Sequence, residues 1–437
     1  MEDISMVSSI FRALWGDISR EEFKKFGLLS GVFFFIVGSY WMMRTMKNAV
    51  FMHLIAPEAL PYAKMVSLIS IITILVFYNK LVDLFEKTKL VYVIAGFYSV
   101  LYFGLAYFLA HPTIGIANHV PSSDRLLGWI IYVAIESFGS IVIPLFWAYV
   151  ASIMDTGSAR RGYPIIVSGA QLGSILGTFL VMMFADSIGL PILFIVSAIA
   201  VLCVPIMIRY FEAHFPIIPS QEAKKKSTGV IEGLRLILAK PYLRGILVVS
   251  TVYEIIGTIF EYQMNRLAHD SLQSVGKVAG FLGMQGFLIN CLSFAFALLG
   301  TSLFIRTFGL TACLVIYPCA IAGLVLYAWS FPALATFLFC VVTLKGLGYA
   351  LNNPCKEIMY IPTSKDIKFK AKSWIEAQGG RSAKGIGSGV NALFPVLSQL
   401  LTYGSMISLG IIAFWIPVAL FVGKKNSLLV QENKIVE

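Results

Sequence analysis

Charged residues are scarce in this sequence. Asp, Glu, Lys and Arg make up 13% of the 437 residues, whereas hydrophobic residues make up 58% and the mean hydropathy is +0.82. A water-soluble protein needs more polar surface than this composition supplies, which excludes a large soluble domain and indicates a polytopic membrane protein. Each membrane-spanning helix needs about 20 mostly apolar residues, so the chain has room for roughly twelve.

The sequence also lacks the patterns of a metalloprotein or an enzyme. Its six cysteines lie in or beside apolar runs without metal-ligand spacing, and its five histidines are scattered. It contains no nucleophile elbow and no phosphate-binding loop of the form GxxxxGKS/T. We therefore expect no metal, no cofactor and no enzymatic chemistry.

The basic residues are concentrated at the ends of the apolar runs. The net charge of +11 could suggest nucleic acid as a partner, but the positive-inside rule accounts for lysines and arginines at membrane boundaries. The segments that share the side of the N-terminus hold most of them. We therefore expect both termini in the cytoplasm, a lipid bilayer as the surroundings, and no nucleic-acid partner.

Apolar runs bounded by charges or turn residues predict twelve spans. The spans lie near residues 27–50, 63–80, 89–110, 126–152, 163–185, 189–210, 245–265, 279–304, 308–329, 332–353, 381–402 and 404–423. A basic linker, 211–244, separates an N-terminal six-helix half, 1–210, from a C-terminal one, 245–437. This all-α organisation in two six-helix halves is typical of the major facilitator architecture.

Ionisable residues inside the predicted spans are few and regularly placed. Because a charge in the bilayer is costly, such residues usually face a water-filled cavity, pair with each other or bind a ligand. They occur in the first and fourth span of each half, which is the pattern of pseudo-symmetric repeats around one cavity. These residues are Arg44 and Lys47, then Glu136, then Glu254 and Glu261, and finally Lys345.

Arg44 and Lys47 are three residues apart, so they share one face of a helix and could meet the same anionic group. An arginine fork grips phosphate oxygens and lysine supplies a mobile point charge, which suits a polyanionic substrate. The alternative is an internal salt bridge to Glu136 or Glu261. Both can hold, because a cavity that alternates its access can exchange substrate contacts for internal pairs.

Aromatic residues accompany these charges. Trp41 precedes Arg44, and Phe146 with Trp147 follow Glu136. An exposed ring in a polar cavity could stack a nucleobase. Aromatic residues make up 14% of the chain, however, and most of them face lipid or the helix core.

The segment after the tenth span carries a recognisable motif. Asn353 and Pro354 are expected to close that span. Residues 354–362 then read PCKEIMYIP and resemble the P-x-K-E-x-x-Y-I-P run of the bacterial and plastidic ATP/ADP translocases, and a glycine-rich helix start with Lys384 follows. Residues 44–48, RTMKN, resemble the same family's R-x-x-K-D. The resemblance extends more loosely over all twelve spans.

The resemblance implies a nucleotide transporter, usually one that exchanges ATP for ADP in obligate intracellular bacteria or plastids. The family's essential residues correspond by position to Lys47, Glu136, Glu261 and Lys384, with Lys356 in the motif beside them. Glu254 is an alternative for the glutamate of span seven because it lies deeper. The family's aspartate is Asn48 here, and the resemblance assigns no role to Lys345.

The sequence thus predicts a monomeric carrier of ATP, ADP or a related nucleotide. It would lie in the inner membrane of a bacterium with an intracellular lifestyle and work by alternating access, with basic residues binding the phosphates. The alternative is a proton-coupled importer of another nucleotide, NAD or a different organic anion. The absence of an ATPase motif indicates that a counter-substrate or proton gradient supplies the driving force.

Overall fold

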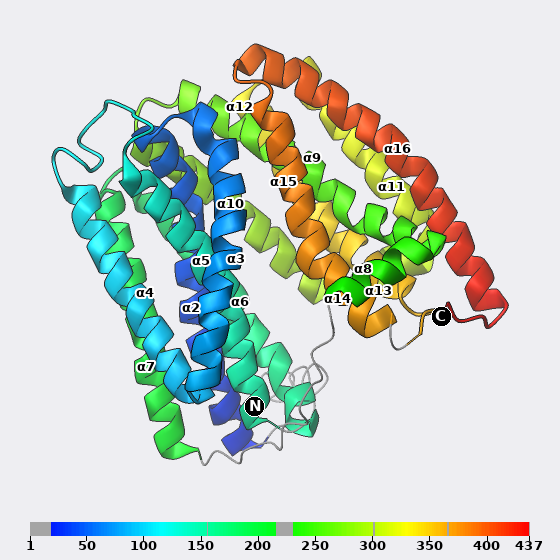
Figure 1. Ribbon diagram of the computed structural model, residues 1–437, viewed down its shortest axis with the longest axis horizontal. Helices are drawn as coiled ribbons and strands as arrows, with labels where there is room; N and C mark the ends of the chain where they lie inside the picture. The colour runs from blue at the N-terminus through cyan, green and yellow to red at the C-terminus, as the bar shows by residue number, and fades with distance from the viewer. Residues whose placement is uncertain (1–18, 155, 216–229, 300–301, 365–366, 437) are drawn as a thin grey trace, which may run out of the picture. The chain divides into compact units, whose positions relative to one another are not determined.

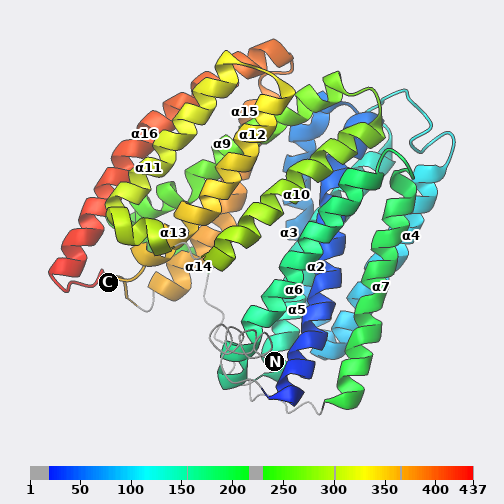
Figure 2. The ribbon, with the colours of Figure 1, turned by 180° about the vertical axis from the view of Figure 1, so that it is seen from behind.

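A computed structural model describes residues 19–154, 156–215, 230–299, 302–364 and 367–436. These residues form helices and no strand (Figure 1, Figure 2). The helices of the first part are α2 (Arg20–Leu54), α3 (Leu60–Leu84), α4 (Lys87–Ala110), α5 (Leu126–Ile153), α6 (Thr156–Phe184) and α7 (Leu190–His214). Those of the second part are α8 (Val230–Ala239), α9 (Pro241–Ser271), α10 (Val275–Leu299), α11 (Ser302–Ser330), α12 (Leu334–Leu347), α13 (Asn353–Met359), α14 (Lys372–Trp374), α15 (Gly380–Ala392) and α16 (Leu397–Gln431).

Within the described ranges, eleven helices are long and apolar enough to cross a membrane. They include counterparts of the first ten predicted spans. The predicted boundary between the last two spans was wrong, because α15 ends at Ala392 and α16 begins at Leu397. A residue that precedes proline disfavours the helical region, and Pro395 lies in this turn.

The tenth span does not close at Asn353 and Pro354 as expected. A π-helical turn, Gly348–Asn352, follows α12, and α13 continues from Asn353 to Met359. Proline lacks an N–H and clashes with the preceding turn of an α-helix. Pro354 instead lies in the first turn of α13, where no N–H is needed, and the wider π-turn precedes it. The helix therefore carries the PCKEIMYIP motif almost to its end.

The described chain packs as two compact units. Unit 1 contains residues up to Ala56, Ile69–Ala223 and Ser274–Asn290, and unit 2 contains Pro57–Leu68, Lys224–Gln273 and the residues from Cys291 onward. The chain thus contributes the start of α3 to unit 2 and most of α10 to unit 1. The expected linker 211–244 includes the end of α7, α8 and the start of α9, and its AKKK stretch lies outside the described residues.

Unit 1 is built around α2, which packs against α5, α6 and α7. Three glycines of α6, each four residues from the next, face the backbone of α2. A Cβ added to Gly173 would lie 2.3 Å from the carbonyl oxygen of Phe34, and one added to Gly177 would lie 2.2 Å from that of Gly38. Small residues at this spacing allow membrane helices to approach backbone to backbone. The approach fixes α2 against α6.

In unit 2 the central helix is α9, which packs against α12, α15 and α16. A Cβ added to Gly387 of α15 would lie 2.8 Å from the carbonyl oxygen of Ile255 on α9. The start of α15 is rich in glycine, and Gly387 permits this close approach. This contact brings the polar side chains of α15 next to the polar centre of α9.

Candidate functional site

Lys47 of α2 forms an ion pair with Glu136 of α5 in unit 1. Its Nζ atom also lies 4.5 Å from the centroid of the Tyr132 ring, one turn earlier on α5. The Lys47 side chain is 6% exposed and that of Glu136 is 28% exposed. A carboxylate and a ring face both stabilise a buried ammonium group. The first and fourth predicted spans therefore bring their charges together.

Arg44 lies one turn before Lys47 and contacts aromatic rings of its own helix. Its guanidinium carbon lies 5.0 Å from the centroid of the Trp41 ring, and Nη1 donates a hydrogen bond to the Tyr40 hydroxyl at 3.3 Å. Planar guanidinium groups stack well on such rings and keep their fork of donors. Arg44 is half-buried, so unit 1 holds two cations of different chemistry one turn apart on α2.

Phe146 and Trp147 lie further along α5. Phe146 is 1% exposed and stacks on Phe33, with ring centroids 4.5 Å apart. Trp147 packs edge-on against Tyr163 at 5.1 Å. Ten residues of helix, about 15 Å, separate Phe146 from Glu136. The structure therefore places these two rings in the packing of unit 1, whereas Trp41 lies beside Arg44.

Glu254 of α9 stands between two lysines in unit 2. Its Oε2 atom lies 3.8 Å from Lys345 Nζ of α12 and 3.8 Å from Lys384 Nζ of α15. Its Oε1 atom accepts a hydrogen bond from the Tyr253 hydroxyl at 2.6 Å. The Glu254 side chain is 14% exposed, against 47% for Lys384. Lys345, which the family resemblance leaves unassigned, thus belongs to the same cluster as Lys384.

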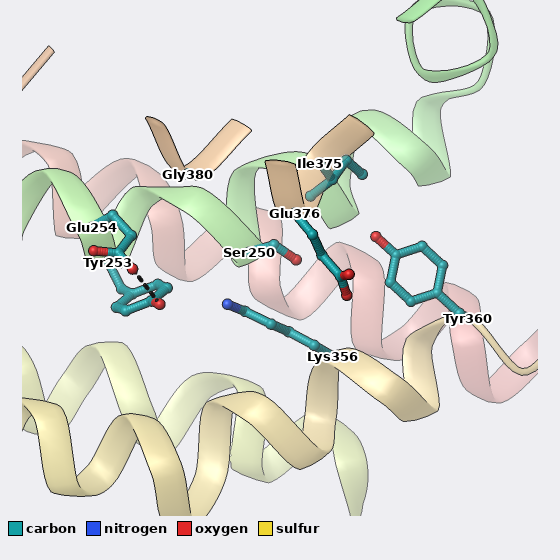
Figure 3. A pocket seen from close by; sticks show the side chains of 8 residues that line it. All are labelled: Ser250, Tyr253, Glu254, Lys356, Tyr360, Ile375, Glu376 and Gly380. Atoms are coloured by element: carbon teal, nitrogen blue, oxygen red, sulfur yellow. Dashed lines mark hydrogen bonds between the residues drawn. The ribbon is translucent and has the colours of Figure 1, made fainter. Parts of the chain in front are cut away.

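A cavity of about 140 Å³ adjoins this cluster (Figure 3). Figure 3 shows Lys356 extending from its helix toward Tyr253 and Glu254, with Glu376 beside its stem. Lys356 Nζ lies 4.4 Å from the centroid of the Tyr253 ring, and among the described residues no carboxylate oxygen lies within 4.0 Å of it. The cavity is lined by Ser250, Tyr253, Glu254, Lys356, Tyr360, Ile375, Glu376 and Gly380.

Glu261 lies two turns beyond Glu254, about 10 Å along α9. Its carboxylate is 3.9 Å from Lys64 Nζ, near the start of α3 and also in unit 2. One turn further, Arg266 pairs with Glu58 at 2.7 Å and is 7% exposed. The structure therefore places Glu254, rather than Glu261, with Lys345, Lys356 and Lys384.

Sequence reasoning missed three contributors to these clusters. Lys64 was treated as the edge of the second span, although it lies one turn inside α3 and reaches Glu261. Tyr253 was one of many aromatic residues, and only its place next to Glu254 could have drawn attention to it. Glu376 lies in a segment expected to be a loop, where it lines the cavity and pairs with Lys372 at 3.7 Å.

These arrangements suit the binding of a polyanion. Each unit holds several cations in membrane helices together with a carboxylate, and ammonium and guanidinium groups are the side chains that bind phosphate. Within the described residues, no group of three or more His, Cys, Asp or Glu side chains gathers as a metal site would require.

The fold resembles several solved membrane transporters. The nucleoside transporter NupG, solved as a point mutant, is 13% identical, with a TM-score of 0.59 over 91% of this chain and 99% of that chain. A bacterial homologue of the iron transporter ferroportin, in an inward-facing state, is 13% identical, with a TM-score of 0.61 over 93% of this chain and 100% of that chain. The fold is that of a multi-pass membrane transporter of the major facilitator type.

The family model described as "TLC ATP/ADP transporter" matches residues 2–426, and the chain belongs to that family. ADP,ATP carrier protein 1 of Rickettsia bellii (strain RML369-C) is 24% identical over 98% of this chain and 98% of its own length. The chloroplastic ADP,ATP carrier protein 2 of Arabidopsis thaliana is 24% identical over 94% of this chain and 76% of its own length. The resemblance seen in the sequence motifs is thus confirmed.

Proposed function

We propose that this protein exchanges ATP and ADP, or closely related nucleotides, across the bacterial inner membrane by alternating access. The observation that carries the proposal is the convergence of Lys345, Lys356 and Lys384, from three separate segments, on Glu254 and its cavity. Cations that are costly to hold in a membrane persist where they serve a pathway or a ligand. A chain of phosphates has the charge and the several oxygens that such a cluster needs.

In this proposal each unit holds its own candidate phosphate ligands. Lys47 and Arg44 act in unit 1, and Lys356 and Lys384 act in unit 2. Glu136 balances Lys47 while no nucleotide is bound. Trp41, which already stacks with Arg44, is the aromatic side chain best placed to contact a base. Glu261, paired with Lys64, is assigned to the structure of unit 2 rather than to the phosphates.

The experiment is nucleotide exchange in proteoliposomes. Vesicles that contain the purified protein and internal ADP should take up labelled ATP, and unlabelled nucleotides should compete in an order that defines the substrate. GTP, UTP and NAD complete the panel. A folded protein that neither takes up nor exchanges any of these nucleotides would overturn the proposal. Uptake that needs an inward proton gradient and no internal nucleotide would favour the proton-coupled alternative.

The role of Lys356 is tested in the same vesicles. Lys356→Gln removes the charge and leaves a polar side chain that is one atom shorter, so it should raise the KM for ATP by about tenfold, equivalent to about 1.4 kcal/mol. Lys240→Gln is the matched control, because Lys240 is exposed at the start of α9 in the same unit. Equal KM values for the two variants would exclude Lys356 as a phosphate ligand.

A further inference from the structure

We propose that Glu254 is a built-in competitor of the substrate, which occupies the place of a phosphate between Lys345 and Lys384 and so promotes release of the bound nucleotide. The inference rests on the proposed function. It goes beyond that function because it assigns to a carboxylate of the site the task of weakening binding.

The geometry gives the two carboxylate oxygens of Glu254 different partners. One carboxylate oxygen, Oε2, is equally distant from the two ammonium groups, at 3.8 Å from each. The other, Oε1, is held by the Tyr253 hydroxyl at 2.6 Å. A single oxygen shared by two lysines is also the position that a phosphate oxygen would take. The carboxylate thus imitates the charge of the substrate.

The distances indicate that Glu254 interacts only weakly with the two lysines. A charge-assisted hydrogen bond between an ammonium group and an oxyanion is about 2.7–2.9 Å long, and 3.8 Å lies beyond hydrogen-bonding range. Glu254 therefore balances the two charges without a short bond to either. The hydrogen bond that the Tyr253 hydroxyl donates to Oε1 keeps the carboxylate from moving closer to the two lysines.

Exchange requires such a balance. A site with several cations and no internal anion would hold a polyphosphate tightly, and each cycle would wait for its release. When the nucleotide leaves, Glu254 is already in position to compensate Lys345 and Lys384. Without it the departing phosphate would take a compensating negative charge away from both ammonium groups, which a membrane interior disfavours.

The proposal predicts opposite changes in affinity for two variants. Glu254→Gln removes the competing charge at almost constant shape, so the Kd for ADP should fall by about threefold or more, as the loss of one ion pair allows. Tyr253→Phe keeps the ring under Lys356 but frees the carboxylate to approach the lysines, so the Kd should rise. Both are measured on the purified full-length protein by calorimetry with ADP as the titrant.

A matched control is Glu232→Gln, because Glu232 is 54% exposed on α8 and pairs with Lys370, and neither residue lines the cavity. Its Kd should equal that of the wild type. An unchanged or higher Kd in Glu254→Gln would overturn the inference and assign Glu254 to direct contact with the ribose or base. If Glu254→Gln does not fold, Tyr253→Phe decides alone, since an unchanged or lower Kd contradicts the proposal.

The two proposals fail in different ways. A wild-type protein that neither binds nor exchanges nucleotides removes the proposed function itself. If the wild-type protein exchanges ADP but the Glu254→Gln variant binds ADP no more tightly, only the proposed role of Glu254 as a competitor is excluded. Slower exchange by Glu254→Gln at saturating nucleotide, measured in vesicles, would be the expected consequence of slower release.

Discussion

Several charged side chains lie within apolar helices of this protein. Different contacts stabilise each of them. Lys47 is compensated by Glu136 and the Tyr132 ring, whereas Arg44 stacks on Trp41. Lys356 lies over the Tyr253 ring at a cavity. The kind of compensation distinguishes the residues, because an ion pair can be structural, while a cation that lines a cavity is positioned for an external anion.

Lys47 can be a ligand, a structural partner of Glu136, or both, and a double variant separates these roles. Lys47→Ala alone leaves the carboxylate of Glu136 uncompensated, so both stability and nucleotide affinity should fall. Lys47→Ala with Glu136→Gln removes that charge. We expect the double variant to recover the thermal midpoint of the wild type and still bind ADP at least about tenfold more weakly.

The measurements are thermal unfolding of the detergent-purified protein and its shift with added ADP. Recovery of both stability and affinity in the double variant would show that Lys47 is only structural. The control is Lys89→Ala with Glu86→Gln, since these residues form an exposed pair on the same unit, at 3.4 Å. Such surface pairs contribute about 0–1 kcal/mol, so this control should leave both measurements nearly unchanged.

At the scale of the helix, glycine decides which elements can approach each other. Gly173 and Gly177 of α6 lie against the backbone of α2, and Gly387 of α15 lies against that of α9. These contacts place the helices that carry the candidate ligands. Not every glycine has this task, because a Cβ added to Gly27 of α2 would meet nothing within 4 Å.

Gly173→Ala should therefore destabilise the protein. The added Cβ would lie 2.3 Å from the carbonyl oxygen of Phe34, so the two helices must separate, and overpacking of this kind costs about 1–3 kcal/mol. Gly27→Ala is the matched control and should leave stability unchanged or raise it, because alanine favours a helix by about 1 kcal/mol over glycine. Thermal unfolding in the same detergent measures both. Similar midpoints for the two variants would contradict the close approach.

At the scale of the whole molecule, hydropathy predicted the first ten spans and the all-helical class well, because a long apolar run has few other solutions in a membrane. It failed near residue 393. The helix α15 is rich in glycine, serine and basic residues, so no apolar edge marked its end, and only Pro395 signalled the turn. The π-turn before Asn353 was unpredictable for another reason, since it depends on packing rather than on local preference.

The sequence was sufficient to identify most charged residues of the candidate site, but not to predict which of them pair with each other. Interior charges can be counted in a sequence, which is how Lys47, Glu136, Glu254 and Lys345 were found. Their pairing depends on which helices touch, and the contacts place Glu254 with Lys345 and Lys384 but Glu261 with Lys64. Lys64 was not recognised as a site residue, because a lysine near the end of a span is usually explained by the membrane boundary.

The orientation of the chain stays a prediction and has a direct test. Positive-inside reasoning places the C-terminus in the cytoplasm and the loop between α4 and α5 outside. In a protein whose six native cysteines are replaced by serine, Val120→Cys should react with an impermeant maleimide in intact cells. Ile435→Cys should react only after permeabilisation. These two residues are 70% and 63% exposed, so a reversed pattern would mean a reversed orientation.

The glycine contact between α2 and α6 also has a mechanical consequence. Side chains can absorb a small displacement by changing rotamers, but two backbones in contact cannot. The helix that carries Arg44 and Lys47 should therefore move together with α6 as one rigid body. If a bound phosphate displaced Lys47 and with it α2, α6 would be displaced by nearly the same amount.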